Sequence, residues 1–215
     1  MAQTSTASTP TSTPAGGNRG ATQTQWDNSW FDRLTAKHKA VFDSPDFAEG
    51  NILGPGQATR YINGVHDALG SSDVQTVIVV RHHAIAFAFN DAMWAKYEIG
   101  KDLKIAGDGE EWATKNPFSA SRSRGGRGGA APPAGNNDRP QGNAEWLSTH
   151  GHILLGCDLA TQGYAGTIAS RTKGTMKTIY EELKANLVPG MILQPNGVYA
   201  ALRAQEAGCV FMRST

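Results

Sequence analysis

The stretch Val74-Gln75-Thr76-Val77-Ile78-Val79-Val80 decides the fold class of this chain of 215 residues. It is nearly all apolar and rich in β-branched residues, which is typical of a strand buried on both faces of a parallel sheet. Residues 55–69, just before it, carry apolar side chains at helical spacing and are followed by Gly70. This pattern predicts a helix that leads directly into a buried strand.

The alternation of helix and strand continues on both sides of this pair. Further strands are predicted at residues 39–42, 152–156, 191–194 and 209–212. Helices are predicted over residues 170–187, which Pro189 stops, and 198–207, which Gly208 ends. In the less regular segment 84–97, Asn90 or Asp91 is expected to cap a short helix. The alternation predicts an α/β fold, a doubly wound, mostly parallel sheet with helices on both faces.

Two segments have compositions that do not favour a folded core. Residues 1–25 are mostly Thr, Ser, Gly, Pro and Gln, and residues from about 119 to 143 are rich in Gly, Arg and Pro. We therefore predict a disordered N-terminal tail and a flexible insertion within a single domain spanning residues 26–215. Arg122, Arg124 and Arg127 resemble a short RGG segment, but three arginines in a loop are more typical of a solvated insertion.

The bulk composition excludes several classes of function. The formal net charge is +1, so no overall field drives the chain toward nucleic acid or acidic membranes. No apolar stretch reaches the roughly 18 residues that a membrane helix needs. We therefore expect neither a nucleic-acid partner nor a membrane span. The two cysteines lack the spacing of a structural zinc site and are too few for a disulfide framework.

The predicted strands place chemically active residues at one edge of the sheet. Ligands of open α/β sheets bind beyond the carboxyl ends of the strands. Residues at or just after those ends form the predicted site: Cys157, His82 and His83 as catalytic residues, and Arg81, Asp158, Gln194, Asn196 and Asp43 as substrate-binding residues.

Cys157 is the candidate nucleophile or sulfur carrier of this site. It follows a buried strand and precedes a predicted helix, whose N-terminal partial charge favours a thiolate. His82 or His83 could deprotonate it or, when protonated, hold its thiolate. The competing interpretation is a small buried apolar residue. Cys209 begins its strand and should lie at the opposite edge, so we predict two unpaired thiols.

Other kinds of site have weaker support in the sequence. His82, His83 and Cys157 are chemically suitable ligands for copper or zinc, but no ligand spacing supports a metal site. No GxGxxG follows a strand, and neither a P-loop nor a GxSxG motif is present. We therefore predict no nucleotide cofactor and no serine hydrolase chemistry.

Four stretches, in this order along the chain, together carry a family resemblance: residues 39–43, 77–83, 154–160 and 188–209. They resemble the DsrE/DsrF-like family of sulfur-relay proteins, and the family's cysteine position falls on Cys157. The resemblance implies an α/β subunit that assembles into homo-oligomers and carries sulfur as a persulfide. Within the family the chain is most similar to an uncharacterised exported branch, which, with the polar tail, favours a mature periplasmic form.

Three functional hypotheses follow from these observations. The first is a small sulfur-binding or sulfur-relay protein that passes a persulfide sulfur from Cys157 to a thiol-bearing acceptor protein. The second is a non-enzymatic scaffold or assembly subunit of the same fold. The third is a metal- or haem-binding protein that uses His82, His83 or Cys157.

Overall fold

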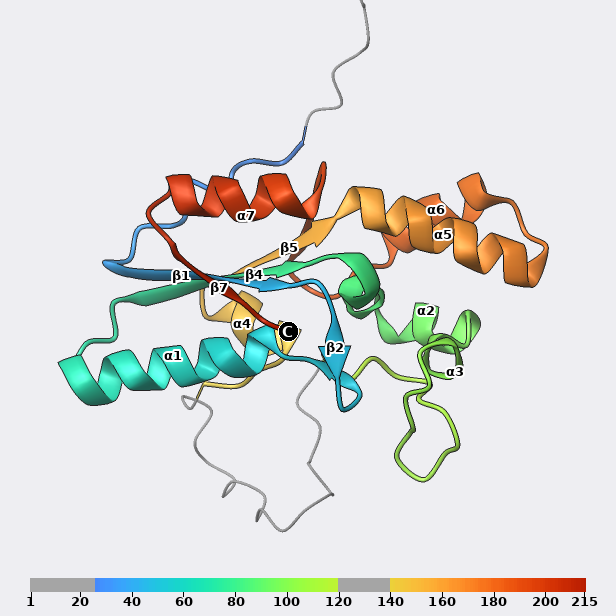
Figure 1. Cartoon of the computed structure of the whole chain (residues 1–215), viewed down its shortest axis with the longest axis horizontal. Coiled ribbons are helices and arrows are strands. Elements are labelled where there is room, and N and C mark those ends of the chain that lie inside the picture. Colours follow the sequence, from blue (N-terminus) through green and yellow to red (C-terminus); the bar gives the residue numbers. More distant parts are fainter. Residues whose placement is uncertain (1–25, 120–139) are drawn as a thin grey trace, which may run out of the picture.

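A parallel sheet forms the centre of the molecule (Figure 1). The structure is a computed structural model that describes residues 26–119 and 140–215. Within these residues, five parallel strands lie in the order β6-β5-β4-β1-β7. Their bounds are β1 (His38–Ser44), β4 (Val74–Val80), β5 (Ile153–Cys157), β6 (Met191–Gln194) and β7 (Val210–Arg213). The predicted α/β fold with a parallel sheet is confirmed.

Helices cover both faces of this sheet, because successive side chains along each strand point to opposite faces. On one face, Val41, Val77 and Val79 pack with α7 (Gly197–Glu206) and with Trp30. On the other face, the alternate strand residues pack against α1 (Gly54–Leu69), the 3₁₀ helix η1 (His82–Ala88) and α4 (Ala144–Thr149). Both faces of each central strand are therefore buried, which explains the nearly continuous apolar run in β4.

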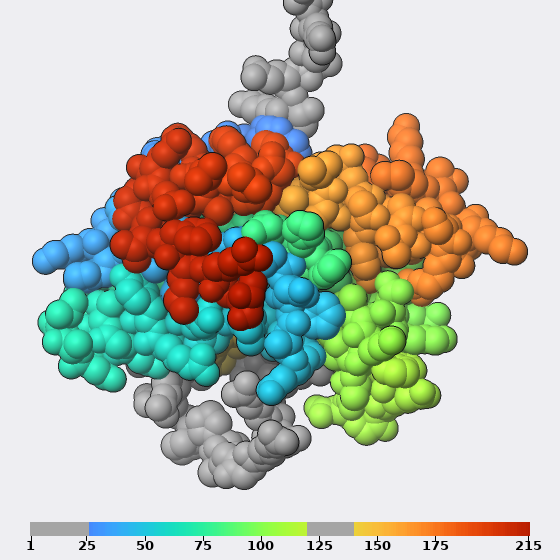
Figure 2. Space-filling view, viewed as in Figure 1, coloured from blue at the N-terminus to red at the C-terminus, as the bar shows by residue number. Residues whose placement is uncertain are grey.

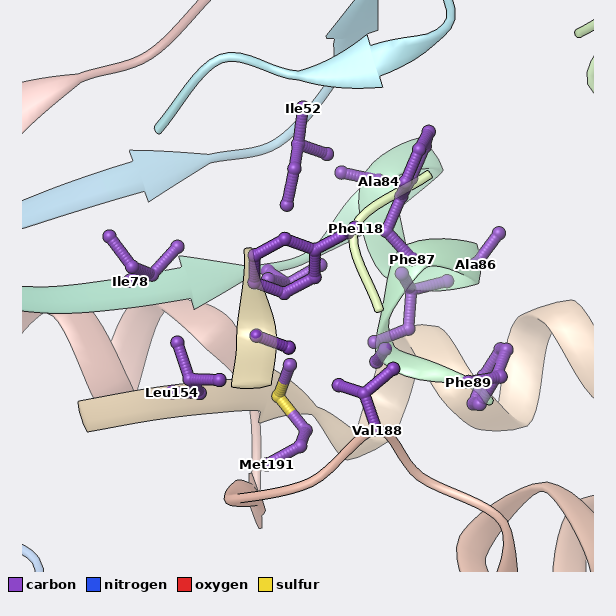
Figure 3. Packing of buried hydrophobic residues seen from close by; sticks show 14 of the residues in the cluster. Ile52, Ile78, Ala84, Ala86, Phe87, Phe89, Phe118, Leu154, Val188 and Met191 are labelled. Carbon is purple, nitrogen blue, oxygen red and sulfur yellow. The ribbon is translucent and has the colours of Figure 1, made fainter. Parts of the chain in front are cut away.

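The larger core lies between the sheet and η1. Figure 3 shows Phe118 at the centre of this cluster, among Ile52, Ile78 and Phe87. Phe87 also contacts the Trp94 ring, with ring centroids 5.4 Å apart. Together these aromatic side chains fix η1 just beyond the end of β4.

The remaining elements lie mainly beyond the carboxyl ends of the strands (Figure 1). They are the short strands β2 (Phe47–Ala48) and β3 (Asn51–Ile52), and the helices α2 (Asp91–Lys96), α3 (Ile99–Asp102), α5 (Asp158–Thr172) and α6 (Met176–Ala185). Asn90 caps α2 by accepting a hydrogen bond from the Met93 N–H at 3.3 Å, so the sequence predicted this cap correctly. These elements therefore surround the carboxyl edge of the sheet and can contribute side chains to a site there.

The single helix predicted over residues 170–187 is wrong. The chain forms α5, which ends at Thr172, and α6, which begins at Met176. Lys173 adopts a left-handed backbone conformation with φ of 57° and ends α5. The apolar stripe still identified buried side chains, because Ile179 and Leu183 face the core from α6.

The ends of the predicted insertion lie next to each other. The Ala144 N–H donates a hydrogen bond to the Phe118 carbonyl at 2.8 Å, and the Glu145 N–H donates to the Ser119 carbonyl at 3.2 Å. Most of the predicted insertion, and all of the predicted tail, lie outside the described residues. Residues 118–119 and 144–145 are therefore neighbours in the folded domain.

At the opposite, amino-terminal edge of the sheet, His152 is buried in a neutral form. It is only 7% exposed, and its Nδ1 accepts a hydrogen bond from the Thr76 N–H at 3.1 Å. An imidazole with an unprotonated Nδ1 cannot carry a charge. Burial, with a smaller contribution from His150, lowers the pKa of His152 to about 4.

We predict that this histidine makes the protein sensitive to acid. An unfolded histidine titrates near pH 6.5, so in the window between about pH 6.5 and pH 4 the unfolded chain binds a proton that the folded protein does not. The free energy of unfolding should fall as the pH is lowered through this window, by about 3 kcal/mol in total. Urea unfolding at several pH values should show this loss in the wild type.

The variant His152→Asn keeps a hydrogen-bond acceptor but cannot titrate, so its stability should depend less on pH in this window. His66→Asn is the control, because the His66 side chain is 72% exposed. Equal pH dependence in the wild type and in His152→Asn would contradict the prediction.

Candidate functional site

Cys157 joins the sheet to helix α5 at the carboxyl edge. It is the last residue of β5 and the N-cap of α5. Its Sγ accepts a hydrogen bond from the Ala160 N–H at 3.3 Å. The thiol is 6% exposed, and it lines a cavity of about 870 Å³. A sulfur anion at this position would have a backbone donor and the positive end of a helix beside it.

The cavity brings together several residues that the sequence places after different strands. Arg81, His82 and His83 follow β4, Cys157 ends β5, and Asn196 follows β6, and all five line the cavity. The register explains the proximity, since Val80 pairs with Gly156 and Cys157 pairs with Gln194. A thiol, a guanidinium and two imidazoles therefore surround one open space.

Arg81 is held rigidly by a buried carboxylate. Its Nε donates to Asp43 Oδ1 at 2.6 Å, and its Nη2 donates to Asp43 Oδ2 at 2.7 Å. The Asp43 residue is only 4% exposed. This hydrogen bonding, together with smaller electrostatic attractions to Asp43 and Cys157, holds the pKa of Arg81 above its ordinary value. Arg81 is thus a fixed cation that lines the same cavity as Cys157.

Gly197 makes room for the Arg81 side chain. A Cβ atom at position 197 would lie 2.5 Å from Arg81 Cδ and 2.7 Å from Arg81 Cβ. The aliphatic part of Arg81 therefore lies directly against the first residue of α7. The absence of a side chain at Gly197 is what allows the guanidinium to reach Asp43.

The two histidines are exposed side chains on the cavity lining. His83 Nδ1 lies 3.8 Å from Asp46 Oδ1, and the two imidazole rings are 6.0 Å apart and nearly perpendicular. His82 has a positive φ of 52°, which is uncommon for a residue with a side chain. Both residues are exposed and line the cavity.

Three of the predicted substrate-binding residues do not line the cavity. Both carboxylate oxygens of Asp43 accept hydrogen bonds from Arg81. The Asp158 carboxylate is buried and accepts hydrogen bonds from Tyr180 Oη and Gln162 Nε2, each at 2.7 Å. Gln194 is buried and donates from Nε2 to the Asp27 carbonyl at 2.8 Å. The hydrogen-bond partners of these three side chains come from Arg81, from α5 and α6, and from the N-terminal segment, respectively.

Asn196 caps helix α7 and also belongs to the cavity lining. Its Oδ1 accepts a hydrogen bond from the Tyr199 N–H at 2.8 Å, which caps α7. The residue also lines the cavity. Its polar oxygen is therefore already committed to the helix.

Sequence reasoning missed a second group of lining residues. They come from the residues around β2, from η1, from α3 and the residues after it, from α5 and from α7: Asp46, Phe47, Ile85, Asp102, Leu103, Lys104, Leu159, Ala160, Gly163, Tyr164, Thr167, Gly197 and Val198. Leu159 and Val198 directly follow predicted site segments, so proximity in sequence could have identified them. Leu103 and Lys104 lie in irregular structure that carries no strand or helix signal.

Cys209 differs from Cys157 in both place and chemistry. It precedes β7, which runs parallel to β1, and so lies at the opposite edge of the sheet. Both cysteines are free thiols, as predicted. Burial raises the pKa of Cys209 to about 11, against an opposing effect of Lys39. Cys209 therefore stays protonated near neutral pH.

The described residues contain neither a metal-ligand cluster nor a candidate membrane span. Within residues 26–119 and 140–215, no group of three or more His, Cys, Asp or Glu side chains is arranged to hold a metal ion. No helix in these same ranges is long and apolar enough to cross a membrane. His82, His83 and Cys157 thus share a cavity without forming a metal-ligand cluster.

We predict that removing Arg81 leaves a costly buried charge on Asp43. Arg81→Met should lower the free energy of unfolding by about 3 kcal/mol, because breaking a buried pair leaves one charge uncompensated. The double variant Asp43→Leu/Arg81→Met should recover most of this loss. Urea unfolding measures both changes.

The control for this prediction is Lys101→Met. Lys101 forms an exposed pair with Glu98 at 3.5 Å, and its loss should cost less than about 0.5 kcal/mol. If Arg81→Met and Lys101→Met had equal effects, the Asp43–Arg81 pair would not be the constraint described above.

No protein-family model matches the chain, no curated protein matches it, and no solved structure matches it.

Proposed function

We propose that the chain is a small sulfur-binding or sulfur-relay protein that carries sulfane sulfur as a persulfide on Cys157. The observation that carries this proposal is the position of the Cys157 sulfur. It accepts the Ala160 N–H at the start of α5 and opens on a cavity that Arg81, His82 and His83 also line. The resemblance of residues 154–160 to the cysteine segment of the DsrE/DsrF-like family supports the same function.

The reaction consists of two thiolate attacks on a sulfane sulfur. The Cys157 thiolate attacks the outer sulfur of a persulfide R–S–SH, the S–S bond breaks, and its electron pair leaves with R–S⁻. The product is Cys157–S–SH, and the proton stays on the transferred sulfur. An acceptor thiolate then attacks that outer sulfur and releases the Cys157 thiolate, so no external oxidant or reductant is consumed.

The surrounding groups have distinct roles in this proposal. The Ala160 N–H and the α5 N-terminus stabilise negative charge on the Cys157 sulfur. Arg81, fixed by Asp43, supplies a positive charge that does not depend on pH near neutrality. His82 and His83 exchange protons with the incoming and leaving thiols. The acceptor thiol belongs to a partner protein, which receives the sulfur from Cys157.

The test of the sulfur-carrier function is intact mass after incubation with a sulfane-sulfur donor. The wild type should gain a reductant-sensitive adduct of one sulfur atom, about 32 Da, because Cys157 attacks the donor. Cys157→Ser should gain none, whereas Cys209→Ser should load like the wild type, since its thiol is buried and protonated. Sulfur loading that survives in Cys157→Ser would contradict the proposal.

A specific observation favours a second candidate function, an assembly subunit. Within residues 26–119 and 140–215, the edge strand β7 pairs with β1 alone, and it exposes three large apolar side chains: Val210 (63%), Phe211 (46%) and Met212 (47%). Figure 2 shows this C-terminal segment as one continuous surface with α7. Unprotected apolar edge strands pair readily with other strands. A second copy of the chain would cover this edge in a homo-oligomer.

We predict that the wild type self-associates through β7. Phe211→Lys should shift the protein to a smaller species in analytical ultracentrifugation, because a charge on the edge opposes strand pairing. Leu69→Lys is the matched control, since Leu69 is 61% exposed but lies at the end of α1. A wild type that stays monomeric at the highest concentration reached would reject this candidate.

A further inference from the structure

We propose that the cavity beside Cys157 selects organic sulfur compounds with an apolar body, such as alkyl or aryl persulfides and thiols, over inorganic sulfur anions. This inference rests on the proposed role of Cys157 and names the substrate class of the same site. It is carried by the size, the lining and the charge balance of the cavity.

The cavity is far larger than a transferred sulfur atom requires. Its volume of about 870 Å³ lies within the range of roughly 300–1,000 Å³ that is usual for pockets that bind organic ligands. Several of its walls are apolar: Phe47, Ile85, Leu103, Leu159, Tyr164 and Val198. Of these, Leu159 and Val198 are 65% and 60% exposed, so an apolar ligand would bury surface that water now contacts.

The fixed charges of the lining residues and of their ion-pair partners cancel overall, so the cavity beyond the Cys157 sulfur carries no excess of positive charge. Arg81 is committed to Asp43. Asp102 accepts a hydrogen bond from Tyr164 Oη at 3.1 Å and pairs with Arg171 Nε at 3.6 Å. Besides the imidazoles of His82 and His83, this leaves two charged lining residues of opposite sign, Asp46, which lies 3.8 Å from His83, and Lys104. A small inorganic anion would therefore find no excess of fixed positive charge.

Helix α5 leaves space for the body of the ligand next to the sulfur. Ala160, Gly163, Tyr164 and Thr167 share one helical face and line the cavity, starting one turn after Cys157. A Cβ atom at Gly163 would have no neighbour within 4 Å. A molecule whose sulfur reaches Cys157 can therefore lie along this face of α5.

Methanethiosulfonates test this selectivity with one leaving group throughout. The Cys157 thiolate attacks R–S–SO₂CH₃ at the R-bearing sulfur, forms Cys157–S–S–R and releases CH₃SO₂⁻ with the bonding electron pair. The reagents are the methyl, benzyl, 2-sulfonatoethyl and 2-aminoethyl forms. Peptide mass locates the adduct on Cys157, and each rate is divided by the rate for N-acetylcysteine amide.

The benzyl reagent should have a normalised rate about tenfold above that of the methyl reagent, because burial of the ring precedes the attack. Neither charged reagent should exceed the methyl reagent. Normalised rates that are equal within twofold across the series, or a preference for the sulfonatoethyl form, would overturn the inference.

Gly163→Leu tests whether the selectivity arises in this cavity. It should remove the benzyl advantage and keep the methyl rate, because its side chain would occupy the space along α5. Gly64→Leu is the matched control, since Gly64 is also helical and exposed with no neighbour within 4 Å of a Cβ. A benzyl advantage that persists in a folded Gly163→Leu variant would place the selectivity elsewhere and overturn the inference.

A second pair of variants decides the question if Gly163→Leu does not fold. Leu159→Ser should reduce the benzyl advantage, whereas Leu69→Ser, which is similarly exposed on α1, should not. Equal benzyl advantages in the two variants would overturn the inference.

Sulfur loading is measured separately on the same proteins. Flat selectivity with intact loading rejects this inference alone, and lost loading with intact selectivity rejects only the sulfur-carrier function.

Discussion

The parallel hydrogen bonding between β4 and β5 is the constraint on which the site depends. It pairs Val80 with Gly156, so the residues that leave these two strands emerge side by side. Arg81 and Cys157 therefore come together although they are far apart in the chain. Because β1 pairs with β4 in the same direction, Asp43 reaches the same edge and fixes Arg81. An antiparallel strand at any of these places would move one of the three groups to the other edge.

The sequence predicted those parts of the molecule that depend on local pattern and on the direction of the strands. The bounds of β4 and β6 agree with the predicted strands, because buried strands leave continuous apolar runs. The break at Lys173 was missed, since the apolar stripe of α6 alone does not reveal a left-handed residue before it. Asp158 follows β5, as the sequence predicted. The direction of its side chain is set by a hydrogen bond from Tyr180, a contact between helices that no local pattern encodes.

The site combines a rigid part with an open part. Asp43, Arg81 and the N-terminus of α5 fix the electrostatic environment of the Cys157 sulfur, and all of them are attached to the sheet. The opposite walls come from shorter and less regular elements, including the residues after α3. This division is common in α/β proteins, where a rigid scaffold positions the reactive group and surrounding loops determine what reaches it.

The contact between Gly197 and Arg81 also limits how this protein can diverge. Any side chain at position 197 would collide with the Arg81 aliphatic chain at 2.5 Å. A homologue that gains a side chain there must shorten residue 81, and the Asp43 carboxylate then loses the two hydrogen bonds that Arg81 donates to it. Positions 43, 81 and 197 should therefore change together or not at all during evolution. Three residues from separate parts of the chain are thus expected to coevolve.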